Sequence, residues 1–205
     1  TILLWDYNKM TVISKMTAPA HSEITCMTFL YNCCLVATGH EDGAIRLWNL
    51  EINTSVLLKC AEDMKHTNTI SCIKGVIWKD SEILLCGSYD GRISNWEISE
   101  SKRGATGSMN STIFPQLRQI IDNTRVPRGE FDNKNDGDEI LVIEFFEKRE
   151  GEEGYIIVGG NNRWIQVYSI RTGVLEMQME GHEDSVTCMV IDGNILITGS
   201  DDHSI

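Results

Sequence analysis

Residues 39–48 read GHEDGAIRLW, and this pattern recurs along the 205-residue chain. The further copies are GSYDGRISNW at 87–96, GGNNRWIQVY at 159–168 and GSDDHSI at 199–205, and TILLW at 1–5 matches the tail of the same unit. Self-similarity at a period of roughly 40 residues is typical of a repeat architecture. The chain is therefore best understood as copies of one supersecondary unit.

Each copy predicts four short antiparallel strands. In the first full copy we expect strands at 24–30, 35–38, 44–50 and 55–60, because β-branched and aromatic residues alternate there with polar ones. Asp42-Gly43 is a strong tight-turn signal between the second and third strands, and Asp90-Gly91 repeats it in the next copy. The predicted fold class is all-β.

One long insertion interrupts the third copy. Residues 99–139 are rich in Ser, Asn, Gly and Asp, and part of this segment, at about 108–114, must supply the outer strand of the second copy. Apolar residues then recur at helical spacing after Pro115 and predict a short amphipathic helix over about 115–123. This helix either packs on its own scaffold or presents a face to a partner.

Composition excludes several classes of function. The formal net charge is −12, which argues against nucleic acid as the main partner. No apolar run approaches the ~18 residues of a membrane span, and no secretory signal opens the chain. The seven cysteines contain no CxxC pair, and Cys26, Cys72 and Cys188 share one repeat position, so we expect reduced, buried thiols in a cytoplasmic protein rather than a zinc site.

Taken together, the repeats resemble the WD-repeat family of β-propellers. The family's Gly-His, turn Asp and closing Trp-Asp are matched by His21, Asp42 and Trp48 in the first copy, and Trp5-Asp6 is a fully matching tail. The resemblance implies a propeller of four-stranded antiparallel blades. About four blades' worth is present, at about 1–16, 21–60, 66–114, 136–180 and 182–205. The interpretation that the chain is part of a larger propeller, either seven-bladed or tandem, is favoured. The alternative is a four-bladed ring closed by a composite blade made from the two terminal half-blades.

The same resemblance implies a structural role for the signature residues. In family members a His, a strand hydroxyl, the turn Asp and the Trp indole form one buried hydrogen-bonded chain, which is favoured here over a catalytic His-Asp pair. Its members are His21, Thr38, Asp42, Trp48, His66, Asp90, Trp96, His182, Thr198 and Asp202. The second copy has Cys86 at the hydroxyl position, so its chain is expected to be broken or bridged differently. The third copy carries Asp136, Val158, Asn162 and Tyr168 at the four places.

Propellers of this family mostly serve as platforms for other proteins, so the resemblance implies a non-catalytic scaffold within a multi-subunit assembly. Residues beside the His loops and Asp turns are the candidates to contact partners, and most of them are acidic, which suits a basic segment. They are Glu23, Glu41, Tyr89, Asn161, Glu183, Asp184 and Asp201. The alternative is that they are ordinary solvated turn residues.

Other functions find less support in the sequence. It offers no catalytic, cofactor-binding or metal-binding residues, because it lacks a phosphate-binding glycine motif, GxSxG, HExxH and any unexplained cluster of Cys, His and acids. Substrate receptors of ubiquitin ligases carry an Arg two residues after Trp-Asp, and only Arg171 fits, behind Tyr168-Ser169. A structural role in a cytoskeletal or ciliary complex is compatible with the insertion.

Overall fold

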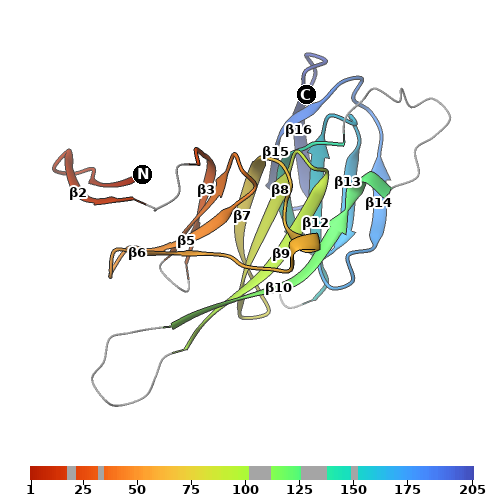
Figure 1. Ribbon diagram of the computed structural model, residues 1–205. Coiled ribbons are helices and arrows are strands. Elements are labelled where there is room, and N and C mark those ends of the chain that lie inside the picture. The colour runs from red at the N-terminus through yellow and green to blue at the C-terminus, as the bar shows by residue number, and fades with distance from the viewer. Residues whose placement is uncertain (18–21, 32–34, 102–111, 126–137, 149–151) are drawn as a thin grey trace.

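The computed structural model describes residues 1–17, 22–31, 35–101, 112–125, 138–148 and 152–205. Within these ranges the chain is almost entirely β-strand, arranged as antiparallel sheets that stand side by side (Figure 1). The predicted all-β fold is confirmed. Its two short 3-10 helices are η1 (Glu62–Met64) and η2 (Asn123–Arg125).

Three sheets have four strands each, paired in sequence order. The first sheet contains β3 (Ile24–Leu30), β4 (Leu35–His40), β5 (Ile45–Asn49) and β6 (Thr54–Leu57). The second contains β7 (Ile70–Trp78), β8 (Ser81–Ser88), β9 (Arg92–Ser101) and β10 (Thr112–Asp122). The third contains β11 (Ile140–Glu147), β12 (Gly154–Gly160), β13 (Ile165–Ser169) and β14 (Leu175–Met179).

A two-stranded sheet flanks this set on either side. β1 (Ile2–Asp6) pairs with β2 (Thr11–Met16) beside the first sheet, and β15 (Val186–Asp192) pairs with β16 (Ile195–Ser200) beside the third (Figure 1). The first strands β3, β7, β11 and β15 neighbour one another in that order, so they form the inner side of the array. This is the blade arrangement of a propeller.

The apolar core lies between the sheets, because the four-stranded sheets bury both faces of their central strands, such as β4, β8 and β12. Leu47 of the first sheet and Trp96 of the second belong to one buried cluster, whereas Leu85 of the second and Ile156 of the third belong to the next. Trp48 closes a smaller cluster with Ile2 and Met16 of β1–β2. Central strands are therefore buried on both faces and read as short continuous apolar runs such as Ile-Leu-Leu-Cys in β8.

The repeated glycines allow neighbouring sheets to approach closely. A β-carbon on Gly39 would lie 2.4 Å from Ile70 Cγ2, and one on Gly87 would lie 2.6 Å from Ile140 Cγ2. In both cases the contact is with the first residue of the next sheet's inner strand. Successive sheets are also joined by a hydrogen bond at the same level, such as the one that Ser71 Oγ donates to the Ile140 carbonyl. These glycines are spacers between sheets.

The structure corrects the prediction for residues 115–123. They form no helix, because β10 runs unbroken from Thr112 to Asp122 and pairs with β9 along its length. The outer strand of the second sheet therefore extends well past the predicted 108–114, and Pro115 is tolerated because β10 is an edge strand. Ile113 and Leu117 pack on the cluster shared with the first sheet, whereas Ile121 packs on the cluster shared with the third sheet. The bulge between Leu117 and Gln119 produces this change of face, and the resulting spacing imitates a helical period. Residues 102–111 and 126–137 of the predicted insertion lie outside the described residues.

Candidate protein-binding rim

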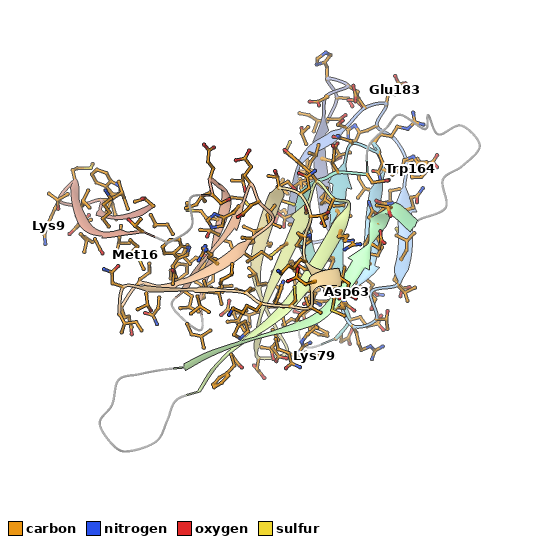
Figure 2. The ribbon with its side chains drawn as sticks, viewed as in Figure 1. Lys9, Met16, Asp63, Lys79, Trp164 and Glu183 are labelled. Carbon is orange, nitrogen blue, oxygen red and sulfur yellow. The ribbon has the colours of Figure 1, made fainter. Side chains whose placement is uncertain are left out.

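The turns between the second and third strands of each sheet lie at one end of the array, together with the loops that lead into each inner strand. The turns at Asp42-Gly43 and Asp90-Gly91 place their glycines in the left-handed region, with φ of 78° and 74°. A β-carbon at Gly43 would meet the His66 carbonyl oxygen at 2.6 Å, so this turn touches the entry loop of the next sheet. Turns and loops therefore form one continuous edge, at whose far end Glu183 lies (Figure 2).

In the first sheet a buried relay of hydrogen bonds anchors this edge. Trp48 Nε1 donates to Thr38 Oγ1 at 2.8 Å, and Thr38 Oγ1 lies 3.0 Å from His40 Nε2. His40 Nδ1 faces the Ser22 carbonyl at 3.3 Å, and since a carbonyl only accepts, the ring proton belongs on Nδ1 and Nε2 accepts from Thr38. Burial lowers the pKa of His40, which keeps the ring neutral as this relay requires.

His40 occupies the place that the sequence analysis gave to His21. His21 lies outside the described residues, and the imidazole bonded to Thr38 is that of His40, from the GHEDG stretch itself. The backbone amide of Asp42 donates to Ser22 Oγ at 3.3 Å, and the Asp42 carboxylate accepts from the Ala44 amide at 3.2 Å. Although burial opposes it, the hydrogen bond from Ser22 and that from the Ala44 amide lower the pKa of Asp42.

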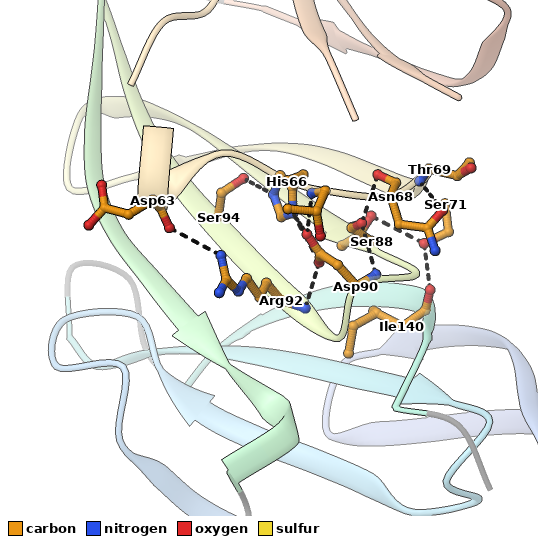
Figure 3. Close-up of polar contacts among 12 residues, drawn as sticks. Asp63, His66, Asn68, Thr69, Ser71, Ser88, Asp90, Arg92, Ser94 and Ile140 are labelled. Atoms are coloured by element: carbon orange, nitrogen blue, oxygen red, sulfur yellow. Dashed lines mark hydrogen bonds and ion pairs between the residues drawn. The ribbon is translucent and has the colours of Figure 1, made fainter. Parts of the chain in front are cut away.

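The second sheet uses a different hydroxyl (Figure 3). His66 Nδ1 donates to the Asp90 carboxylate at 3.1 Å, and His66 Nε2 lies 2.9 Å from Ser94 Oγ. Cys86 stands where Thr38 stands in the first sheet, and within the described residues the buried Trp96 Nε1 has no hydrogen-bond partner. Burial would raise the pKa of Asp90, but the hydrogen bonds from His66 and from the Thr67 amide lower it.

Of the remaining sheets, β15–β16 has the His, hydroxyl and Asp of the relay without an indole, and the third sheet replaces the relay with other residues. In β15–β16, His182 bonds Asp202 at 2.9 Å through Nδ1 and Thr198 Oγ1 at 2.8 Å through Nε2. In the third sheet Tyr168 instead donates its hydroxyl proton to Oδ1 of Asn123 in η2, directly after β10 of the second sheet. Asn162 donates to Gln166 Oε1 at 3.2 Å. The third sheet is thus tied laterally to its neighbour rather than through its own loop.

One backbone contact recurs at this edge in the three four-stranded sheets and in β15–β16. The amide before the turn Asp donates to the residue that precedes the inner strand, as Glu41 does to Glu23 at 3.1 Å and Tyr89 does to Thr69 at 3.0 Å. The same contact joins Asn161 to Glu139 and Asp201 to Ser185. These backbone pairs make the positions structurally equivalent and bring Glu41 beside Glu23 in the chain's fold.

Exposed acidic side chains lie at or beside several of these positions. Glu23, Glu41, Glu183, Asp184 and Asp201 are exposed, and Tyr89 is 40% exposed. The set is named here the acidic rim and comprises Glu23, Glu41, Tyr89, Asn161, Glu183, Asp184 and Asp201. Two of its members also serve the fold, since Asp184 Oδ1 accepts from the Ser185 amide at 2.7 Å and Asn161 Nδ2 donates to Glu139 Oε2.

Sequence reasoning missed three residues of this region. Glu139 is the third sheet's counterpart of Glu23 and adds a carboxylate to the rim, but it lay inside the predicted insertion. Ser94 was overlooked because it replaces the missing hydroxyl of Cys86 from the neighbouring strand. His40 was overlooked because it sits in the strand rather than in the entry loop. Ser94 lies directly opposite Cys86 on the adjacent strand, so a prediction of the β8–β9 strand register would have identified Ser94 as the replacement hydroxyl.

The described part of the chain shows no grouping of three or more His, Cys, Asp or Glu side chains able to hold a metal ion. Its helices are the single turns η1 and η2, and among the described residues none has the length and apolar character of a membrane-crossing helix.

Comparison with known proteins identifies the repeats. The WD domain, G-beta repeat (WD40) profile matches residues 13–49, 58–97 and 173–205. Protein transport protein SEC13-2 of Candida glabrata is 26% identical over 159 residues, which cover 76% of this chain and 48% of that protein. Mitochondrial division protein 1 of the same yeast is 26% identical over 207 residues, covering 96% of this chain and 27% of that protein. The chain thus spans less than half the length of these relatives.

A solved structure shows the same fold. A chain in the crystal structure of the mitotic checkpoint complex superposes with a TM-score of 0.65 at 15% identity, over 97% of this chain and 50% of that one. At 15% identity this match supports the fold, that is, the arrangement of the sheets.

Proposed function

The chain belongs to the WD-repeat family of β-propellers, and on that premise we propose that it is a non-catalytic scaffold that binds other proteins within a multi-subunit assembly. Similar chains are found in such settings, since the superposed structure is that of a complex. Rigid propellers suit this role because they hold many turns at fixed positions along one edge.

The acidic rim is the proposed binding surface, and the partner is proposed to present a basic segment. The observation that carries this proposal is the gathering of exposed carboxylates at the rim, with Glu23 and Glu41 in the first sheet and Glu183, Asp184 and Asp201 beside β15–β16. Carboxylates held at one edge sum to a negative potential that attracts Lys and Arg side chains and speeds their encounter. Tyr89 adds one aromatic side chain of the kind enriched in protein interfaces.

Charge reversal tests this proposal. In the intact protein the double variant Glu23→Lys with Glu41→Lys should weaken binding of a fluorescein-labelled peptide of alternating Arg and Ser by about tenfold or more, equivalent to about 1.4 kcal/mol. The matched control is Glu51→Lys with Glu176→Lys, which changes the net charge equally at exposed positions outside the rim. Equal losses in both variants, or none in the first, would overturn the proposal.

Crosslinking of the native complex provides the second test. A carbodiimide joins a carboxylate directly to a lysine amine, so mass spectrometry should recover crosslinks from Glu23, Glu41 or Glu183 to partner lysines. The exposed carboxylates of Glu51 and Glu176 act as internal controls and should give few. Crosslinks that map mainly to the controls would place the partner elsewhere.

A further inference from the structure

A pocket of about 370 Å³ opens between the second and third sheets at the end opposite the acidic rim. Trp78, Lys79 and Ser81 of the β7–β8 turn form one wall. The other wall comes from Arg118 and Gln119 of β10 and from Arg171 after β13. These six residues are named here the basal pocket. Figure 2 shows Lys79 at this lower end, far from Glu183 and Trp164.

The basal pocket is cationic although the chain is strongly acidic. Three of its lining residues, Lys79, Arg118 and Arg171, carry positive charge, and none carries negative charge. The whole chain has a formal net charge of −12. Glu97 pairs with Arg118 and Glu153 pairs with Arg171, so Lys79 is the lining cation without a carboxylate partner among the described residues. A positive charge of this kind attracts anionic groups.

The strand geometry directs these side chains into the pocket. Leu117 pairs with Trp96 and Gln119 pairs with Asn95, so Arg118 is the extra residue of a β-bulge. Bulges re-aim the side chain that they carry. Gln119 Nε2 donates to the Ile170 carbonyl at 2.9 Å, which fixes β10 against the turn that bears Arg171. Asn95 Nδ2 donates to the same carbonyl at 3.2 Å, so the junction between the sheets is held twice.

The three cationic side chains retain hydrogen-bond donors or positive charge that could pair with a ligand. Arg118 directs Nε and Nη2 to one oxygen of Glu97, at 3.0 and 2.7 Å, and this leaves Nη1 for another acceptor. Arg171 lies 3.6 Å from Glu153, but both side chains are 67% exposed, so water weakens the pair. Lys79 Nζ lies 4.7 Å from the centre of the Trp78 ring and has no carboxylate partner among the described residues.

An exposed aromatic residue extends this surface along β10. Phe114 is 52% exposed and pairs with Ser99, which shares a face of β9 with Glu97 two residues away. Because the Glu97 carboxylate accepts from Arg118, Phe114 and Arg118 lie on the same side of the β9–β10 ribbon. Ser99 Oγ donates to the Phe114 carbonyl at 3.3 Å, which holds this part of the β9–β10 ribbon together. The ribbon continues beyond the neighbouring sheet at the lower left of Figure 1.

We propose that the basal pocket binds an acidic peptide segment of a partner protein, with its carboxylates received by Lys79, Arg171 and the free edge of Arg118. A carboxylate fits better than a doubly charged phosphate because Glu97 already occupies two donors of Arg118 and would repel the second charge. Apolar side chains of the same segment would lie on Phe114. The scaffold then has two faces of opposite sign, one for a basic and one for an acidic partner.

Peptide binding to the intact protein tests the proposal. A short fluorescein-labelled peptide of alternating Glu and Ser should bind at about 50 mM salt and bind more weakly at about 300 mM, where screening is stronger. The double variant Lys79→Glu with Arg171→Glu should weaken this binding by about tenfold or more, equivalent to about 1.4 kcal/mol. The matched control, Lys15→Glu with Lys59→Glu, changes the same charge at exposed positions elsewhere and should stay within about twofold.

Two further measurements keep the outcome decisive. The neutral pair Lys79→Gln with Arg171→Gln should give an intermediate loss, and thermal unfolding of each variant shows that the fold is intact. The rim variant Glu23→Lys with Glu41→Lys should leave acidic-peptide binding within about twofold, which separates this proposal from the function proposed for the rim. Equal losses in the test and control doubles, no binding of the Glu peptide at low salt, or tighter binding of a phosphoserine peptide would each overturn it.

Discussion

Trp48 donates its indole N–H to Thr38 Oγ1 at 2.8 Å, and the same hydroxyl serves the ring of His40, so one buried threonine satisfies two side chains. Thr38 and Trp48 are both buried. Replacing Thr38 by Val keeps the shape and removes both bonds. Because buried groups left without partners cost about 1–3 kcal/mol, we expect Thr38→Val to lower the free energy of unfolding by about that amount.

Urea denaturation of the purified protein measures this loss. Thr54→Val, on the exposed side of β6, removes a hydroxyl that the relay does not use and should change stability by less than about 0.5 kcal/mol. A Thr38→Val protein as stable as the Thr54→Val protein would show that the relay contributes nothing.

The second sheet offers the opposite experiment. Trp96 Nε1 is buried without a partner among the described residues, and Cys86 occupies the position of Thr38. Cys86→Thr would supply the missing hydroxyl, so we expect stability to rise by up to about 1 kcal/mol. Cys72→Thr makes the same substitution at a position that has no unpartnered indole beside it, so it should not stabilise the protein. Denaturation midpoints of the two variants decide between these outcomes.

Gly87 should tolerate no side chain. Its added β-carbon would stand 2.6 Å from Ile140 Cγ2 and 2.7 Å from Cys72 Sγ, so Gly87→Ala must push the second and third sheets apart. We expect a loss of about 1–3 kcal/mol, as for other overpacked cores. Gly181→Ala is the control, because nothing lies within 4 Å of a β-carbon there. Comparable melting temperatures for the two variants would contradict this account of the spacing.

Stability should fall in two steps as the solution is acidified. Burial lowers the pKa of His40, so below its ordinary pKa of about 6.5 the unfolded chain takes up a proton that the folded ring refuses, and stability decreases with falling pH. The pKa of Asp90 is lowered as well, because the hydrogen bonds from His66 and the Thr67 amide outweigh burial. Its contribution is present at neutral pH and is lost below about pH 3.8.

Variants assign the two steps. His40→Asn should flatten the profile between about pH 5 and 6.5, and Asp90→Asn should flatten it below about pH 4, each with lower stability at pH 7. Urea denaturation across this range is the measurement. A His40→Asn profile that keeps the upper step would assign that step to another histidine.

The sequence predicted the fold because its repeat is carried by close contacts that admit few residue types. Gly39 and Gly87 must stay small, and Asp42 and Asp90 must sit in the tight turn, so the pattern survives even where the strands differ. The prediction of a helix after Pro115 was wrong because a bulge in the edge strand β10 moves its buried apolar residues from one face to the other, and this spacing imitates a helical period.

The hydrogen-bonded relays were harder to predict, since they depend on which strand supplies each group. The hydroxyl beside His66 comes from Ser94 on β9 rather than from β8, and the ring beside Thr38 comes from His40 two residues away. Sequence position alone does not identify which hydroxyl or imidazole ring takes part, because the register between adjacent strands determines which side chains are neighbours. The basal pocket was unpredictable for the same reason, as its cations lie far apart in the chain.

The contacts of Gly39 and Gly87 with the next inner strand also bear on the curvature of the array, because they let the inner strands of successive sheets approach closely. Both contacts lie on the inner side, where the sheets converge, and an added methyl group there would widen the inner separation while leaving the outer edges free. The angle between neighbouring sheets would then decrease, and the array would be less curved. We therefore expect the angle between successive blades to depend on the absence of a β-carbon at Gly39 and Gly87.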